Sequence, residues 1–73
     1  MRPKHRRILR LRQLRKERDW TQQQMADRVG LHVNAYNGIE TGRTNPSLEN
    51  AKAIAKVFNL PVDQVFDYVE VPA

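Results

Sequence analysis

Apolar residues recur along most of the chain at intervals of three and four positions, which is the spacing of one face of an α-helix. In residues 6–18, Ile8, Leu11 and Leu14 follow this spacing, and most of the other positions are charged. On a helical wheel Arg15 falls inside the same apolar stripe. The pattern predicts a first helix over residues 6–18 that carries one arginine on its inward side.

A second helix is expected over residues 21–29. Thr21 can cap its start, and Gln24, three residues later, can reach back to the cap, as in the Thr-x-x-Gln capping box. Gly30 follows the last apolar position, and a glycine there allows the positive φ at which many helices end. The segment therefore has a defined beginning and a defined end.

Three more helices complete the pattern. A third is expected over residues 32–41, with Tyr36 and Ile39 facing inward, and a short fifth helix over residues 61–66. The fourth, over residues 48–58 behind the N-cap Ser47, is expected to bury Leu48, Ala51, Ile54, Ala55 and Phe58. No segment has the pattern of a central strand, so the sequence predicts an all-α, compact bundle of about five short helices.

The length of 73 residues suits one domain. We expect a flexible basic arm over residues 1–5, a folded domain over 6–67 and a short tail over 68–73. The sequence contains no cysteine, which excludes disulfides and cysteine-ligated zinc and fits a reducing, cytoplasmic location. No apolar run approaches the ~20 residues of a membrane span.

Positive charge is concentrated at one end of the chain. The formal net charge is +5, and nine of the 13 lysines and arginines lie within the first 18 residues, opposed there only by Glu17. Such a basic end suits a polyanion, either a nucleic acid or an anionic membrane surface. A solvated helix face is the simpler alternative, and charge alone does not separate the two. The arginines spread over several faces of the first helix, which does not fit an amphipathic membrane-surface helix.

The second and third helices, with a glycine between them, form the pattern of a helix-turn-helix. Their tight corner needs a small residue where the helices touch, which Ala26 provides, and a residue free to take positive φ, which Gly30 provides. The inward positions on both sides are apolar, as the arrangement requires. Together these positions indicate a DNA-binding motif more strongly than any one of them does.

The outward face of the third helix is polar but uncharged. Asn34, Asn37, Gly38 and Thr41 share this face by their spacing. An asparagine amide can donate and accept at the edge of an adenine in the major groove, and the neighbouring Val33 can contact a thymine methyl. A glycine within a helix costs about 1 kcal/mol, which a close approach to DNA would explain at Gly38. An ordinary polar surface is the alternative.

Three segments together resemble a known family: Trp20–Gly30, Ile39–Gly42 and Asn45–Leu48. They are similar to the lambda-repressor-like helix-turn-helix family, also called Cro/C1-type or XRE type. The resemblance covers about residues 8–66. It implies five helices, a third helix that reads the major groove, and two-fold dimers on palindromic operators.

The resemblance also implies roles for single residues. Base contacts are expected from His32, Val33, Asn34 and Asn37, with Gly38 added from the helix face, and backbone contacts from Gln22, Thr41, Arg43, Thr44 and Asn45. Arg15 and Glu40 match a structural ion pair between the first and third helices, which explains the inward arginine. The family usually has Ser or Thr where His32 stands, so His32 is expected to serve DNA contact more than capping, with an ordinary part-exposed histidine as the alternative.

Both ends of the chain carry further candidates. Lys4 in the arm, and Arg6 and Arg7 directly after it, are expected to attract phosphates or to enter a minor groove, with simple solubility as the alternative. The apolar C-terminal end offers dimer contacts, which are Val65, Phe66, Tyr68, Val69 and Val71.

The sequence therefore predicts a sequence-specific regulator of transcription that binds double-stranded DNA. We expect a homodimeric repressor of bacterial or phage origin, cytoplasmic and associated with the nucleoid. We expect no catalysis, cofactor, metal or membrane partner, because the chain has no motif for them. The alternative is a protein-interaction module on the same fold, such as an antitoxin that binds a toxin or a coactivator.

Overall fold

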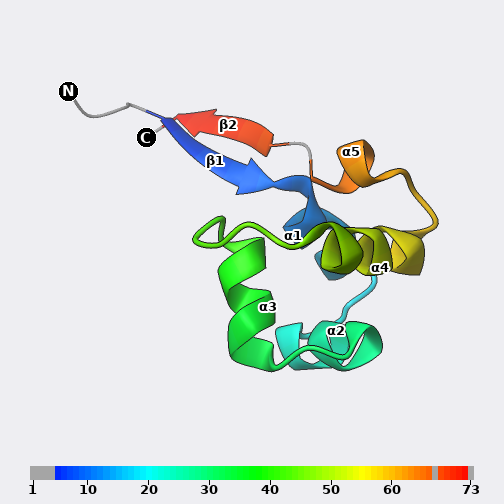
Figure 1. The fold of residues 1–73 in the computed structure, drawn as a ribbon. Helices are drawn as coiled ribbons and strands as arrows, with labels where there is room; N and C mark the ends of the chain where they lie inside the picture. Colours follow the sequence, from blue (N-terminus) through cyan, green and yellow to red (C-terminus); the bar gives the residue numbers. More distant parts are fainter. Residues whose placement is uncertain (1–4, 67, 73) are drawn as a thin grey trace.

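The computed structural model describes the backbone of residues 5–66 and 68–72, and the side chains of residues 10–66. These residues form five helices and a pair of strands, whose arrangement can be followed in Figure 1. In chain order the elements are β1 (His5–Leu9), α1 (Arg10–Glu17), α2 (Gln22–Val29), α3 (Val33–Glu40), α4 (Leu48–Phe58), α5 (Val62–Val65) and β2 (Tyr68–Pro72). The five helices confirm the predicted all-α class, and the strand pair is an addition to it.

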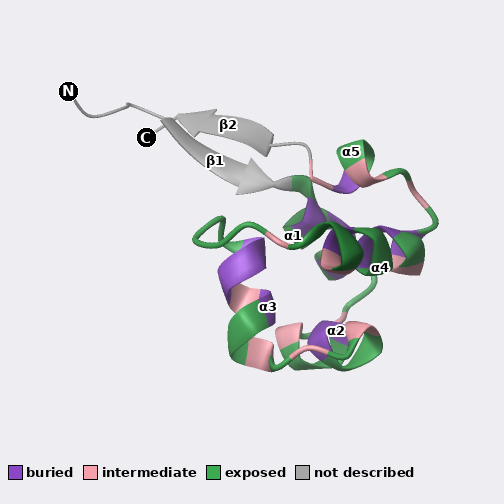
Figure 2. Cartoon of the chain, in the orientation of Figure 1, coloured by how far each residue is buried: buried purple, intermediate pink, exposed green. Residues whose placement is uncertain are grey.

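The helices share one apolar core. Its largest fully buried side chains are Tyr36, Leu11, Met25, Ile54 and Val65. The core also includes Leu14, Ala26, Ile39, Ala55 and Phe58, so each helix contributes to it. Figure 2 shows the buried residues on the sides of the helices that face one another. Such a small core depends on every helix being held in place.

Local capping sets the helix limits, as the sequence predicts. The Thr21 side chain accepts from the backbone N–H of Gln24, and the Gln24 side chain accepts from the N–H of Thr21, which is a complete capping box. Gly30 ends α2 with a φ of 72° and Asn59 ends α4 with a φ of 56°, both in the left-handed region. Ser47 caps α4 through its side-chain oxygen.

The predicted start of the first helix was wrong. Residues 5–9 form β1, which pairs antiparallel with β2, and α1 begins only at Arg10. The register places Arg7 opposite Glu70 and Ile8 opposite Val69. Periodicity reports only local preference, whereas this pairing joins the two ends of the chain, and β2 is rich in valine, which favours strands.

Leu48 is a second correction. It was expected in the core but is 68% exposed, whereas Ala51, one turn later on the same face of α4, is buried. The edge of the core therefore lies between these two positions. A helical spacing identifies a face but does not say where along the helix the packing begins.

Candidate nucleic-acid interface

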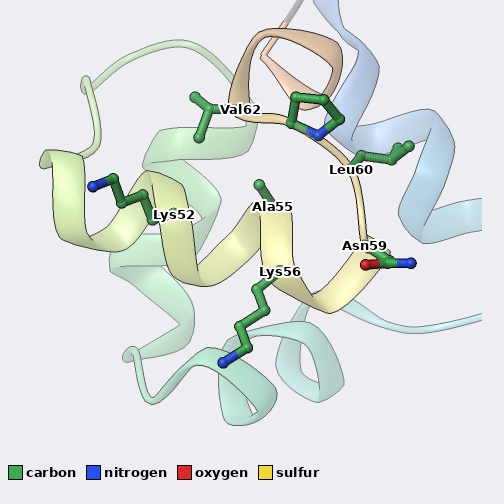
Figure 3. A pocket seen from close by; sticks show the side chains of 7 residues that line it. Lys52, Ala55, Lys56, Asn59, Leu60 and Val62 are labelled. Atoms are coloured by element: carbon green, nitrogen blue, oxygen red, sulfur yellow. The ribbon is translucent and has the colours of Figure 1, made fainter.

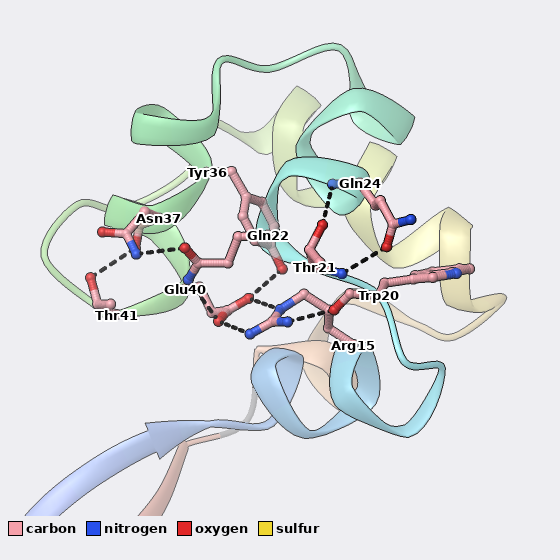
Figure 4. A network of polar contacts seen from close by, with 9 residues as sticks. All are labelled: Arg15, Trp20, Thr21, Gln22, Gln24, Tyr36, Asn37, Glu40 and Thr41. Carbon is pink, nitrogen blue, oxygen red and sulfur yellow. Dashed lines mark hydrogen bonds and ion pairs between the residues drawn. The ribbon is translucent and has the colours of Figure 1, made fainter.

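The arginine inside the apolar stripe of α1 forms an ion pair with α3. Arg15 Nε donates to Glu40 Oε2 at 2.7 Å and Arg15 Nη2 donates to Glu40 Oε1 at 2.9 Å, a two-pronged contact (Figure 4). The two side chains are only 9% and 2% exposed. A third bond, from Arg15 Nη1 to the carbonyl oxygen of Trp20, ties in the start of α2. The predicted pair is therefore present and buried.

The Glu40 carboxylate has two further donors. Tyr36 Oη donates to Oε2 at 2.6 Å, and Gln22 Nε2 donates to Oε1 at 3.1 Å. Within the described residues no buried side-chain nitrogen or oxygen lacks a partner. Sequence reasoning missed the Tyr36 contact, although tyrosine and glutamate four residues apart on one helix are natural neighbours.

The network fixes the charge states of its members. Burial alone would raise the pKa of Glu40, but hydrogen bonds from Arg15, Tyr36 and Gln22 outweigh it and hold the pKa below its ordinary value. The bond to Glu40 raises the pKa of Arg15. Burial, followed by the bond to Glu40, raises the pKa of Tyr36 far above its usual range. The pair is therefore charged, and the phenol neutral, at physiological pH.

The turn between α2 and α3 is closed by backbone bonds. The N–H of Leu31 donates to the carbonyl of Ala26 at 2.9 Å, next to the left-handed Gly30. His32 then caps α3, because its Nδ1 accepts from the N–H of Asn34 at 3.1 Å. The expectation that His32 serves DNA contact more than capping needs correction, since this ring does cap the helix. The side chain is nevertheless exposed.

The two halves of α3 differ in exposure. Asn34 and Ala35 are exposed and Val33 is half-buried, whereas Tyr36, Gly38, Ile39 and Glu40 are buried. Figure 2 shows the exposed part of α3 beside the turn from α2. In helix-turn-helix proteins it is the N-terminal part of the second helix that reaches base edges. The exposed half has the position that this role requires.

Asn37 differs from Asn34, although the two share one face by spacing. Asn37 is half-buried, its Nδ2 donates to Gln22 Oε1 at 3.0 Å, and its Oδ1 accepts from Arg43 Nη2 at 3.0 Å. Figure 4 shows Gln22 between Asn37 and Glu40. The sequence assigned Gln22 to DNA phosphate and Asn37 to a base, but in this structure each amide bonds to the protein itself.

Gly38 is explained by packing within the protein. A Cβ at this buried position would lie 3.0 Å from Thr44 Oγ1. The Gly38 carbonyl also accepts the backbone N–H of Arg43 at 2.9 Å and of Thr44 at 3.1 Å. From the sequence we expected this glycine to allow a close approach to DNA. In the structure its missing side chain instead leaves room for Thr44 in the loop that follows α3.

That loop presents the other expected backbone contacts. Arg43, Thr44 and Asn45 are all exposed. Thr41 is exposed too, but its hydroxyl donates to the carbonyl of Asn37 at 2.8 Å and so closes the last turn of α3. Of the expected arm residues, Arg6 and Arg7 lie in β1, where side chains are not described, and Lys4 lies outside the described residues.

Two further arginines interact with aromatic rings of the protein. The Arg28 guanidinium lies 4.0 Å from the centroid of the Trp20 ring, and that of Arg18 lies 4.7 Å from the centroid of the Phe58 ring. At these distances cation–π attraction contributes to the packing. Part of the basic charge in the sequence is therefore structural.

The candidate dimer contacts separate into three groups. Val65 is fully buried in the core, so its assignment to a dimer interface was wrong. Phe66 is half-buried against the same core. Tyr68, Val69 and Val71 lie in β2, where side chains are not described.

A hollow of about 370 Å³ is lined by α4, by the residues that follow it and by the start of α5 (Figure 3). Its lining is Lys52, Ala55, Lys56, Asn59, Leu60, Pro61 and Val62. These side chains offer neither a carboxylate nor an imidazole for acid–base chemistry. Among the described residues no group of three or more His, Cys, Asp or Glu could hold a metal ion, and none of their helices is long and apolar enough to cross a membrane.

Comparison with known proteins agrees with this geometry. A helix-turn-helix family model matches residues 11–65, from α1 to α5. An uncharacterized HTH-type transcriptional regulator of Archaeoglobus fulgidus is 36% identical over 61 residues, which cover 84% of this chain and 86% of that protein. The cryptic phage CTXphi transcriptional repressor RstR of Vibrio cholerae is 34% identical over 55 residues, or 75% of this chain and 50% of the repressor.

A solved structure shows the same architecture. The crystal structure of a transcriptional regulator from Listeria innocua superposes with a TM-score of 0.73 and 27% identity, covering 82% of this chain and 56% of that one. This chain thus spans about half of two of these relatives and most of the third. It belongs to the lambda-repressor-like (Cro/C1-type, XRE) helix-turn-helix family of DNA-binding transcriptional regulators.

Proposed function

We propose that this protein is a dimeric repressor that reads a palindromic operator by placing the N-terminal half of α3 in the major groove. Asn34 is the observation that carries the proposal. Its amide is exposed on that half, and among the described residues it makes no side-chain hydrogen bond. A free amide of this kind can pair with the N6 and N7 edge of an adenine. Val33 and His32 flank it on the same half.

The loop after α3 is proposed to hold the DNA backbone. Arg43, Thr44 and Asn45 are exposed at the end of α3 opposite to Asn34, so the helix and its loop could span from base edges to phosphates. Contacts to phosphate set the register of a protein on the duplex, while contacts to bases carry the sequence information. Gln22, at the start of α2, would add a phosphate contact if its amide exchanged a partner on binding.

Further positive charge comes from α1. Arg10, Arg12 and Lys16 are exposed on this helix. Together with Arg6 and Arg7 they would attract DNA over a range of several ångströms without reading its sequence.

A second copy of the chain is the proposed partner in binding. One half-site contacted by one short helix gives weak binding, and two-fold dimers on two half-sites about one DNA turn apart solve this problem. The V. cholerae repressor supports repression as the outcome. We place the dimer contact in the C-terminal segment, from Phe66 through β2, because Val65 is already used by the core. The proposal also includes action in the cytoplasm.

Salt dependence of binding to duplex DNA tests the proposal first. The logarithm of the affinity should fall by about 0.9 per phosphate contact for each tenfold rise in salt. Selection of bound duplexes from a random pool should then return two inverted half-sites. An affinity that is insensitive to salt, or a pool that stays random, would reject DNA reading and favour the protein-interaction alternative.

A further inference from the structure

We propose that Asn37 is a positioning residue, which holds Arg43 for a phosphate contact and does not itself read a base. The assignment rests on the proposed DNA-binding function and divides the two asparagines of α3 between two tasks. Its basis is a line of hydrogen bonds from Glu40 through Gln22 and Asn37 to Arg43. Figure 4 shows the line from Glu40 to Asn37.

The two ends of this line fix the direction of every bond in it. A carboxylate such as Glu40 can only accept, and a guanidinium such as Arg43 can only donate. Gln22 must therefore turn its Nε2 to Glu40, which leaves its Oε1 for Asn37. Asn37 must then offer its Nδ2 to Gln22, which leaves its Oδ1 for Arg43. Amide orientation is normally ambiguous, but here the charged ends leave one arrangement.

This arrangement leaves Asn37 poorly suited to read a base. A two-pronged contact with adenine needs the oxygen and the nitrogen of one amide together. The Asn37 side-chain oxygen already accepts from Arg43 and its nitrogen already donates to Gln22. Turning this amide toward a base would therefore break the line of hydrogen bonds. Asn34 carries neither commitment among the described residues and can form such a contact at no cost to the fold.

The same arrangement prepares Arg43 for DNA. Its backbone N–H is bound to the Gly38 carbonyl at 2.9 Å, and its side chain is bound to Asn37 through Nη2. The guanidinium has five N–H donors, so the others stay available for phosphate oxygens. A side chain that is already held loses less freedom when it binds, which strengthens the contact. Through Gln22, this hold extends to the buried ion pair.

The test compares the parent protein with Asn37→Ala, Arg43→Ala and the double variant. Two probes are used: a duplex selected from the random pool and a duplex of arbitrary sequence. Asn37→Ala should weaken binding to both probes alike, by about three- to tenfold, as expected for a lost hydrogen bond. It should also lower the salt dependence toward that of Arg43→Ala. In the Arg43→Ala background it should change the affinity by less than about twofold, because coupled residues are not additive.

Several outcomes would overturn the assignment. Asn37→Ala could weaken only the selected duplex, alter the preferred base in the pool, or have its full effect in the Arg43→Ala background. Either of the first two would make Asn37 a base reader, and the third would show that Asn37 acts independently of Arg43. Asn34→Ala is the matched control, since it changes the same residue type on the same helix and should alter base preference without changing the salt dependence.

A measurement without DNA separates this assignment from the proposed function. In NMR spectra of the free protein, Arg43→Ala should shift the side-chain amide resonances of Asn37 and leave those of Asn34 in place. Arg43 is exposed, so this variant should fold. Unshifted Asn37 resonances would reject the tether even if the protein binds DNA. Failure of the parent to bind any duplex would instead reject the function, and with it the phosphate contact, whatever the spectra show.

Discussion

The two halves of α3 belong to one helix of eight residues but differ in almost every physical respect. The C-terminal half has Ile39 in the core and Glu40 in a buried ion pair, and the neighbouring Tyr36 is fully buried. The N-terminal half presents Asn34 and Ala35 to solvent and contains no charged residue. One half is held by the protein and the other is available to a ligand.

The difference shows how a small domain can hold an exposed helix surface in a fixed orientation. The buried half is linked to α1 through Arg15 and to α2 through Gln22, so the whole helix has a fixed orientation. The exposed half can then carry side chains chosen for contact and not for stability. Changes at the buried residues of the C-terminal half should therefore alter folding, and changes at the exposed residues of the N-terminal half should alter binding.

Removal of Arg15 should have the largest effect. Arg15→Ala would leave the Glu40 carboxylate buried without its main partner, and we expect a loss of about 3–5 kcal/mol in the free energy of unfolding. Urea denaturation measures this loss. Arg12→Ala is the control on the same helix, because Arg12 is exposed and should stay within about 0.5 kcal/mol of the parent. Equal effects of the two variants would contradict the structural role of the pair.

Acid should lower the stability that Glu40 contributes to the fold. The folded state lowers the pKa of Glu40, so its contribution to stability is complete above the unfolded pKa, near 4.5, and is lost as the pH falls through the lower folded value. Unfolding midpoints measured from pH 7 downward should decline in this range. The Glu40→Gln variant should lack the part of this fall in midpoint that Glu40 causes. The Glu49→Gln variant, changed at an exposed position, should show the same fall as the parent.

Asn34→Ala should alter base discrimination and leave stability unchanged. Discrimination at one base position should fall by about 1–3 kcal/mol, the usual value of a two-pronged base contact, while binding to unrelated duplexes changes little. Competition between the selected duplex and single-base variants of it measures this. The unfolding free energy should stay close to that of the parent, and a large drop would mean that the exposed half also supports the fold.

Gly38→Ala should have a smaller effect that depends on Thr44. Alanine favours the helix by about 1 kcal/mol over glycine, but its Cβ would lie 3.0 Å from Thr44 Oγ1. In a Thr44→Ala background that contact is removed, and we expect the substitution to stabilise the protein by about 1 kcal/mol. In the parent background the gain should be smaller or absent. Thermal unfolding of the four proteins separates the two contributions, and equal gains in both backgrounds would exclude the contact.

Features that depend on nearby residues were predictable from the sequence. The capping box at Thr21, the left-handed glycine at position 30 and the cap at Ser47 all depend on residues within a few positions of one another. The Arg15–Glu40 pair is a contact between distant segments. It was accessible because the family resemblance supplied it and because an arginine in an apolar stripe needs a partner.

Features that depend on distant segments were not predictable in this way. Spacing placed Asn34 and Asn37 on one face, but Arg43 of the following loop donates a hydrogen bond to the side-chain oxygen of Asn37 and none to Asn34 among the described residues. The same loop accounts for Gly38. The pairing of β1 with β2 joins the two ends of the chain, and no local pattern near residue 6 reports it.

That pairing has a practical consequence. Because His5 lies opposite Pro72, the two ends of the described chain emerge side by side, and Figure 1 shows them on the far side of the molecule from the turn that begins α3. A covalent bridge of a few residues between these ends would thus close the backbone into a ring without reaching across the exposed part of α3. Such a ring would restrict the unfolded chain and so raise the melting temperature.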